Sequence, residues 1–122
     1  MALNANQRDI KRAQKESHLM REISNLILKI TLDEPALANL FVSRVKLSPD
    51  KSIAYVYMTA PTPEEFETKR PTLVLYKPSI RSSLAQILDS RHTPNLVFLF
   101  DDGSEKQSRI EQLFHKIGVD NS

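Results

Sequence analysis

The segment from Lys77 to Arg81 holds the residues best suited to bind a phosphate group. Its sequence, Lys-Pro-Ser-Ile-Arg, places two cations and a hydroxyl at the predicted start of a helix. The first turn of a helix has unpaired N–H groups and a partial positive charge, so it attracts anions. We expect the Arg81 stem to lie against Leu88 and its head to reach solvent, where it can grip phosphate with two hydrogen bonds. The alternative is that Ser79 only caps the helix beside two ordinary surface cations.

A second group of cations precedes the apolar stripe of the first predicted helix. Residues 1–31 carry six basic and three acidic side chains, a net charge of +3 within a chain whose total is +2. Three of the basic residues fall on the side of the stripe, and a core does not accept unpaired charges. Residues 1–15 therefore overhang the core, are disordered until a partner binds, or form a frayed and solvated terminus. The candidate nucleic-acid contacts at both places are Arg8, Lys11, Arg12, Lys15, Lys77, Ser79, Arg81 and Arg91.

The residue types that carry catalysis are present without the spacing that catalysis needs. The three histidines are far apart in the sequence, and Asp101 with Asp102 is typical of a turn before a helix. Ser82 and Ser83 have no lysine or histidine one helical turn away to act as a base. With two glycines in all, the chain contains no phosphate-cradling glycine loop. The sequence predicts no catalytic centre, no metal site and no cofactor.

Composition indicates one domain over residues 1–122 in a cytoplasmic protein, which we expect to be monomeric. Forty per cent hydrophobic residues suffice for one modest core. The absence of cysteine excludes disulfides and suits a reducing compartment. No apolar run is long enough for a signal peptide or a membrane span.

Alternating apolar residues predict strands at 41–47, 53–59 and 95–100, the first two joined by the turn Ser48-Pro49-Asp50. A helix is predicted over Gln7–Thr31, and Thr62-Pro63-Glu64-Glu65 starts another that Pro71 interrupts. Residues 72–91 are expected to form two helical pieces with a kink near 77–79, although 73–75 could also be a strand. A capping box and apolar spacing predict a last helix over 104–117. The order indicates an α+β domain of two layers, with helices 16–31 and 79–91 on one face of the sheet.

Taken together, these segments resemble the bacterial ribosome-binding factor A family from Arg8 to Ile117. The resemblance depends on the order and spacing of several short motifs rather than on any one of them. They are Arg21-Glu22-Ile23, Glu34-Pro35, Val45-Lys46-Leu47-Ser48-Pro49-Asp50, Ala54-Tyr55-Val56-Tyr57, Ile80-Arg81-Ser82-Ser83-Leu84, Thr93-Pro94-Asn95-Leu96-Val97-Phe98, Asp101-Asp102 and Arg109-Ile110-Glu111-Gln112-Leu113.

The resemblance implies a type II KH-like fold in which a helix–kink–helix replaces the GXXG loop. The family usually carries Ala-x-Gly at the kink, whereas this chain has Tyr76-Lys77-Pro78. It also implies a function without catalysis: binding to the small ribosomal subunit and its rRNA, beside other assembly factors. The family assists late rRNA maturation, including 5′-end processing, and adaptation to cold. Two alternatives stay open, a KH-like nucleic-acid module unrelated to ribosomes and a protein-interaction domain.

Overall fold

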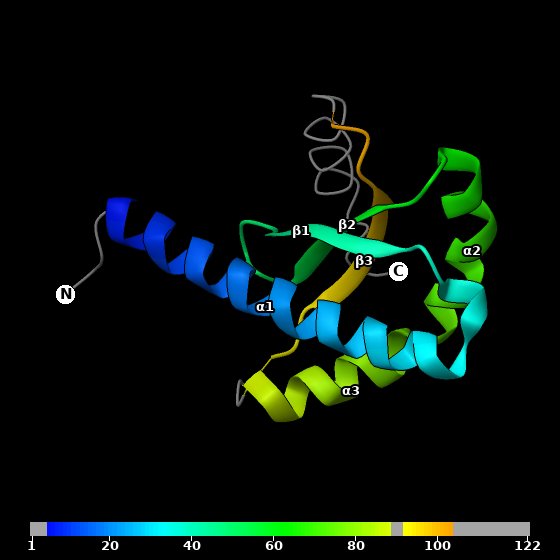
Figure 1. Cartoon of the computed structure of the whole chain (residues 1–122). Coiled ribbons are helices and arrows are strands. Elements are labelled where there is room, and N and C mark those ends of the chain that lie inside the picture. Colours follow the sequence, from blue (N-terminus) through cyan, green and yellow to red (C-terminus); the bar gives the residue numbers. More distant parts are fainter. Residues whose placement is uncertain (1–4, 89–91, 104–122) are drawn as a thin grey trace.

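The computed structural model describes residues 5–88 and 92–103 and contains the predicted order of elements (Figure 1). All three predicted strands form at their predicted boundaries. The predicted helix over 104–117 and the candidate residue Arg91 lie outside the described residues. The elements are α1 (Ala5–Asp33), the short 3₁₀ helix η1 (Pro35–Leu37), β1 (Phe41–Leu47), β2 (Ile53–Thr59), α2 (Pro63–Leu75), α3 (Lys77–Leu88) and β3 (Asn95–Phe100).

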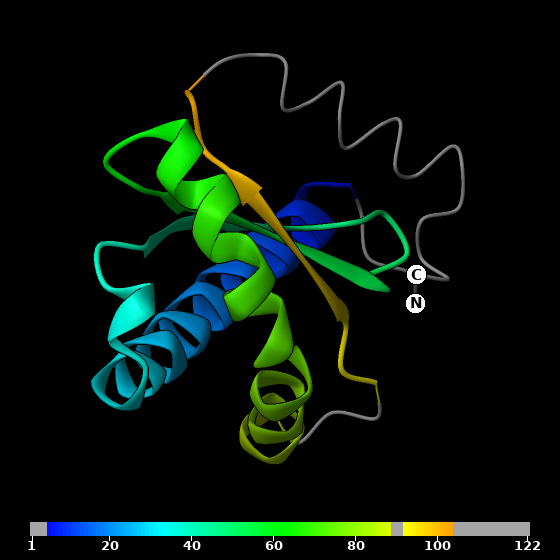
Figure 2. The same ribbon diagram turned by 90° about the vertical axis from the view of Figure 1, so that its right-hand side faces the viewer.

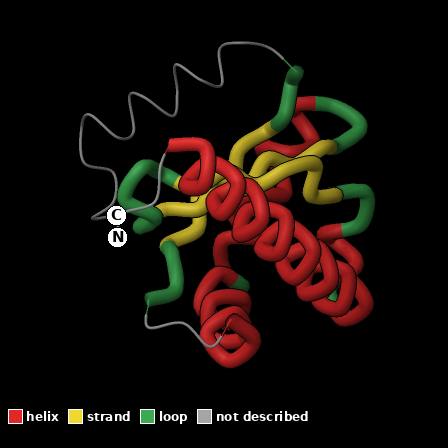
Figure 3. The backbone as a smooth tube through the Cα atoms, turned by 90° about the vertical axis from the view of Figure 1, so that its left-hand side faces the viewer, coloured by secondary structure: helices red, strands yellow, loops and turns green. Residues whose placement is uncertain are grey.

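The three strands form a mixed sheet with β2 in the centre. β1 pairs antiparallel with β2, and β3 pairs parallel with β2, because α2 and α3 carry the chain back across the sheet. The β1–β2 register shifts between Val42 and Arg44, which marks a bulge. α1 and α3 pack on one face of the sheet, as predicted, and Figure 3 shows α1 crossing in front of the strands.

The main core lies between the helices and this face. The apolar stripe predicted for α1 is buried there, with Leu19 and Ile23 fully inaccessible to solvent. Ile80 and Leu84 bury the inner side of α3, whereas Ile87 is 42% exposed. None of the described helices is both long and apolar enough to cross a membrane.

The turn after β1 has the chemistry that its sequence predicted. The Asp50 carboxylate accepts hydrogen bonds from the hydroxyls of Ser48 and Ser52 and from the Ser52 N–H, at 2.7–3.0 Å. The buried Ser48 hydroxyl also accepts from the Ile53 N–H at 3.0 Å. Lys51 adopts a left-handed φ of 63°, which closes the turn.

α2 corrects one prediction, since the helix continues through Pro71 to Leu75. Proline inside a helix costs about 3 kcal/mol. Burial of Phe66 and Leu73 on either side of it offsets that cost, because each buried side chain contributes roughly 1.5–3 kcal/mol. The helix begins as predicted, with the Thr62 hydroxyl accepting from the Glu65 N–H at 3.1 Å.

The kink lies at Tyr76, one residue before the predicted range, and 73–75 is helical rather than a strand. Tyr76 has φ −89° and ψ −1°, and its N–H still bonds the Leu73 carbonyl. Pro78 is the second residue of α3, a position whose N–H has no acceptor within the helix, so proline loses no helical hydrogen bond there. Figure 2 shows the change of direction between α2 and α3.

Candidate nucleic-acid interface

A basic groove runs between the N-terminal half of α1, the β1–β2 turn and the end of α3. It consists of two adjoining hollows of about 550 and 490 Å³, which share Lys15 and Lys51 in their linings. Among the described residues that line the groove, Asp50 is the one carboxylate, and the turn occupies it with hydrogen bonds. The described lining is Lys11, Gln14, Lys15, His18, Asp50, Lys51, Ser52, Leu88, His92, Thr93 and Pro94.

Arg12 builds this groove by holding the turn against α1. Its guanidinium donates to the backbone carbonyls of Leu47, Ser48 and Pro49 at 3.2, 2.9 and 3.1 Å. One helical turn later, the Glu16 carboxylate accepts the Leu47 N–H at 2.7 Å. The two side chains fix both polar groups of Leu47, so the turn that carries Lys51 has a set position beside Lys11 and Lys15.

For three residues at the groove, Arg12, Lys51 and His92, the structure differs from the prediction made from the sequence. Arg12 was predicted as a nucleic-acid contact, and the structure shows a guanidinium engaged with the protein backbone. Arg8 and Lys11 are exposed on the first turns of α1, which extend beyond the buried stripe that begins at Leu19. Within residues 5–15, the part of this segment that the structure describes, the chain is helical and continuous with the rest of α1. Lys51 and His92 were missed, because neither belongs to a charged run.

The predicted phosphate corner lies at the other end of α3, which spans about 18 Å. Ser79 is exposed and Lys77 is partly buried. Arg81 donates through Nε to the Pro94 carbonyl at 3.2 Å and through a terminal nitrogen to the Thr93 carbonyl at 3.1 Å. Arg81 is partly buried, and these two bonds tie α3 to the start of β3, a role that the sequence did not predict.

Arg70 adds a third cation to this corner, and the sequence did not predict it. Partial burial lowers the pKa of Lys77 below its ordinary value, and the charges of Arg70 and Arg81 lower it further. Three positive charges that lie close enough to repel one another attract an anion. Arg70 was missed because Pro71 was expected to end the helix that places it here.

The kink itself is anchored through Tyr76 to Glu34, the residue that follows α1. The Tyr76 hydroxyl donates to the Glu34 carboxylate at 3.3 Å. Partial burial raises the pKa of the Tyr76 phenol above its ordinary value, and the negative charges of Glu34 and Asp33 raise it further. Tyr76 thus stays a neutral donor and holds the start of α3, with Lys77, in one place.

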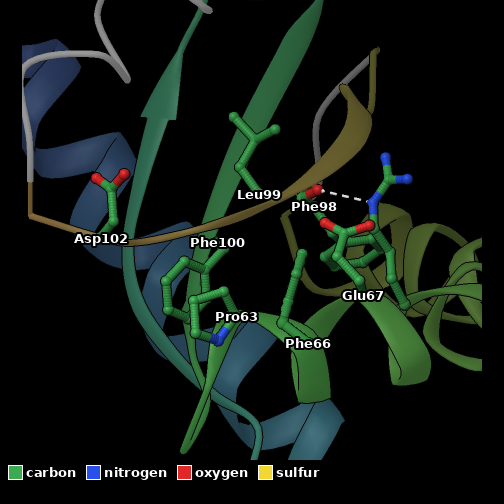
Figure 4. Close-up of a pocket in the computed structure, with 8 residues that line it drawn as sticks. Pro63, Phe66, Glu67, Phe98, Leu99, Phe100 and Asp102 are labelled. Carbon is green, nitrogen blue, oxygen red and sulfur yellow. Dashed lines mark hydrogen bonds between the residues drawn. The ribbon is translucent and has the colours of Figure 1, made fainter.

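A separate pocket of about 300 Å³ lies between α2 and β3 (Figure 4). Its floor is aromatic, with the rings of Phe66 and Phe100 5.8 Å apart. Arg70 closes one end by donating to the Phe98 carbonyl at 3.1 Å. Within residues 5–88 and 92–103, no group of three histidine, cysteine or acidic side chains is placed to hold a metal ion.

Comparison with known proteins identifies the family. The family model described as Ribosome-binding factor A matches residues 11–114. The ribosome-binding factor A of Ruthia magnifica subsp. Calyptogena magnifica is 39% identical over 106 residues, which cover 87% of this chain and 94% of that protein.

Solved structures agree with this assignment. The crystal structure of ribosome-binding factor A from Thermus thermophilus has a TM-score of 0.63 and 32% identity, over 72% of this chain and 93% of that one. A homology model of the Thermus thermophilus factor, fitted into the cryo-EM map of a 30S–RbfA complex, has a TM-score of 0.55 and 31% identity, over 68% of this chain and 87% of that one. The likeness confirms the predicted KH-like α+β fold. This chain belongs to the ribosome-binding factor A family.

Proposed function

We propose that this protein binds the small ribosomal subunit during assembly, in the cytoplasm, and that the basic groove contacts its rRNA. The observation that carries the proposal is the groove itself, in which Lys11, Lys15 and Lys51 surround a surface whose one described carboxylate is already occupied. Lysines at such a surface bind phosphates through charge, without reading base sequence. A relative of the same family has been fitted into the map of a 30S–RbfA complex, which supports this partner.

The corner of Arg70, Lys77 and Arg81 is the second contact in this proposal. It lies about 18 Å from the groove along α3, so an RNA backbone that follows the helix meets cations at both ends. Partial burial lowers the pKa of Lys77, repulsion from Arg70 and Arg81 lowers it further, and a bound phosphate would counter that repulsion. Arg12 acts through the fold by fixing the turn beside the groove, whereas Arg81 both fixes the start of β3 and adds its charge to this corner.

The proposed mechanism is binding rather than bond chemistry. A rigid domain that fits an immature rRNA conformation better than the mature one shifts the RNA population toward the immature state by its difference in affinity. Release follows when maturation removes that conformation. Late maturation of the rRNA, its 5′-end processing and cooperation with other assembly factors belong to this proposal through the family.

Co-sedimentation with purified small subunits tests the proposal. Immature subunits should retain the protein and mature 70S ribosomes should not. The variant Lys15→Gln/Lys51→Gln should bind less tightly, and the control Lys29→Gln, on an exposed part of α1 outside the groove, should bind normally. With about four phosphate contacts, log affinity should fall against log salt with a slope near −3. Equal binding by the groove variant and the control would refute the groove as the contact.

A second function, protein interaction, is favoured by the apolar surface at the C-terminal half of α1. Leu28 and Leu32 are 52% and 83% exposed, and Phe41 is 55% exposed at the start of β1. Leu28, Leu40 and Phe41 line a hollow of about 200 Å³. If subunit binding depends on this surface instead of the groove, Leu28→Ser/Phe41→Ser will abolish it, and the salt slope will lie near zero.

A further inference from the structure

Lys51 has a backbone conformation that lysine rarely adopts. Its φ is 63°, in the left-handed region, where the Cβ atom of an ordinary residue lies too close to the following carbonyl oxygen. Two other residues in the described part of the chain have a positive φ, Gly103 at 74° and Asn39 at 71°. Glycine and asparagine are residue types that tolerate this conformation, so Lys51 is the exception among the three.

The turn between β1 and β2 imposes this conformation on residue 51. The Lys51 N–H donates to the Ser48 carbonyl at 2.9 Å, and the Ser48 N–H donates to the Ile53 carbonyl at 2.9 Å. Hairpin loops built on a β-turn commonly include a left-handed residue of this kind, a position that glycine favours. Hydrogen bonds from Asp50 and Arg12 hold the loop in its shape, so residue 51 has no freedom to relax.

The fold gains no contact from the lysine side chain. Lys51 is exposed, and its ammonium group has no hydrogen-bond or ion-pair partner within residues 5–88 and 92–103. Glycine at the same position would remove the strain and lose nothing that the described structure shows. Backbone strain of this kind persists most often where a side chain is needed to meet a ligand. The lysine therefore has a use outside the fold.

Lys51 occupies the centre of the basic groove. It lines both hollows, a position that it shares with Lys15. α1 supplies Lys11 and Lys15 on one side of the groove, and the turn supplies Lys51 on the other. A phosphate in the groove thus meets cations from two separate elements. An ammonium group attracts phosphate as a point charge, whatever the neighbouring base.

We propose that Lys51 is kept in its strained conformation because its ammonium group is the fixed phosphate contact of the groove. This inference rests on the proposed function, since it takes the RNA backbone as the ligand. The turn sets the position of the Lys51 backbone before RNA arrives, so less conformational freedom is lost when the contact forms. Glycine or asparagine would suit the turn better and would remove the contact.

Replacing Lys51 should change stability and affinity in opposite directions. Lys51→Gly removes both the strain and the charge, so its melting temperature, followed by circular dichroism, should rise by about 3 °C. Its affinity for purified immature small subunits should fall about five- to tenfold, with a salt slope shallower by about 0.7. Lys51→Arg restores the charge in the same strained conformation. It should therefore bind more tightly than Lys51→Gly and melt below it.

Asn39→Gly is the matched control for the change of backbone. Asn39 is exposed, has a similar φ and lies outside the lining of the groove, so this variant should bind normally. If Lys51→Gly binds like the parent while Lys15→Gln binds less tightly, the groove stands and the inference about Lys51 is overturned. A melting temperature of Lys51→Gly below that of the parent also overturns it, because the lysine would then support the fold. Failure of the parent to bind small subunits refutes the proposed function and this inference together.

Discussion

Replacing Arg12 separates a structural role from a contact with RNA. The Arg12→Ala variant loses three hydrogen bonds to the carbonyls of residues 47–49. Arg12→Lys retains the positive charge but replaces the planar guanidinium with one ammonium, which can reach one carbonyl at a time. A role in phosphate binding by charge predicts that lysine substitutes well. A role in holding the turn predicts that it does not.

The expected loss of unfolding free energy depends on how strong the three hydrogen bonds of Arg12 are and how exposed they are to water. A hydrogen bond to a charged group contributes about 1.5–3 kcal/mol. The site is partly exposed, and water can replace the guanidinium at Pro49, so about 2 kcal/mol is expected for Arg12→Ala. For Arg12→Lys the expected loss is about 1 kcal/mol. For a domain of this size, these losses lower the melting temperature by roughly 10 and 5 °C.

Thermal denaturation followed by circular dichroism measures both losses, with small-subunit binding measured well below the transition. Lys11→Ala is the matched control, because Lys11 is exposed and lines the same groove. It should melt within about 0.5 kcal/mol of the parent and bind less tightly. The reasoning is refuted if Arg12→Lys melts like the parent, or if Arg12→Ala loses binding without losing stability.

Three further outcomes are expected. Ile23→Ala should lower the free energy of unfolding by about 2–5 kcal/mol in denaturant titrations, since Ile23 is fully buried; a loss below 1 kcal/mol would place it outside the core. Arg81→Ala should cost about 1.5–3 kcal/mol, because it frees the carbonyls of residues 93 and 94; an unchanged transition would contradict the link between α3 and β3. Because the folded-state pKa of Lys77 lies below 10.5, the unfolded chain binds more protons there, and stability should rise with pH just below 10.5. Lys77→Met should remove that rise and Lys29→Met should not.

The strands could be predicted from the sequence because alternation and turn residues agree along each of them. Ser48, Asp50 and Ser52 form their turn from local hydrogen bonds, so nearby sequence contains the whole explanation. Pro71 was misjudged for the opposite reason. Its local preference opposes a helix, and burial of Phe66 and Leu73 by distant residues outweighs that preference.

The candidate site was predicted less well, because its arginines bond backbone carbonyls. Every residue offers a carbonyl, so no pattern in the sequence marks the partner of Arg12 or Arg81. Lys51 and His92 join the groove through tertiary packing of segments that are about 40 residues apart, and only the fold brings them together. Charge alone thus indicated the helix that bears the groove without indicating which of its cations face solvent.

The two outer strands have a consequence for how the protein behaves before it meets its partner. An exposed strand edge is a template on which other chains can add strands and aggregate. At β3, the side chains of Arg70 and Arg81 occupy backbone carbonyls of residues 98 and 94 and place two positive charges along that edge. At β1, the bulge between Val42 and Arg44 breaks the regular spacing that an incoming strand would need. Both features hinder the addition of a further strand at the described edges of the sheet.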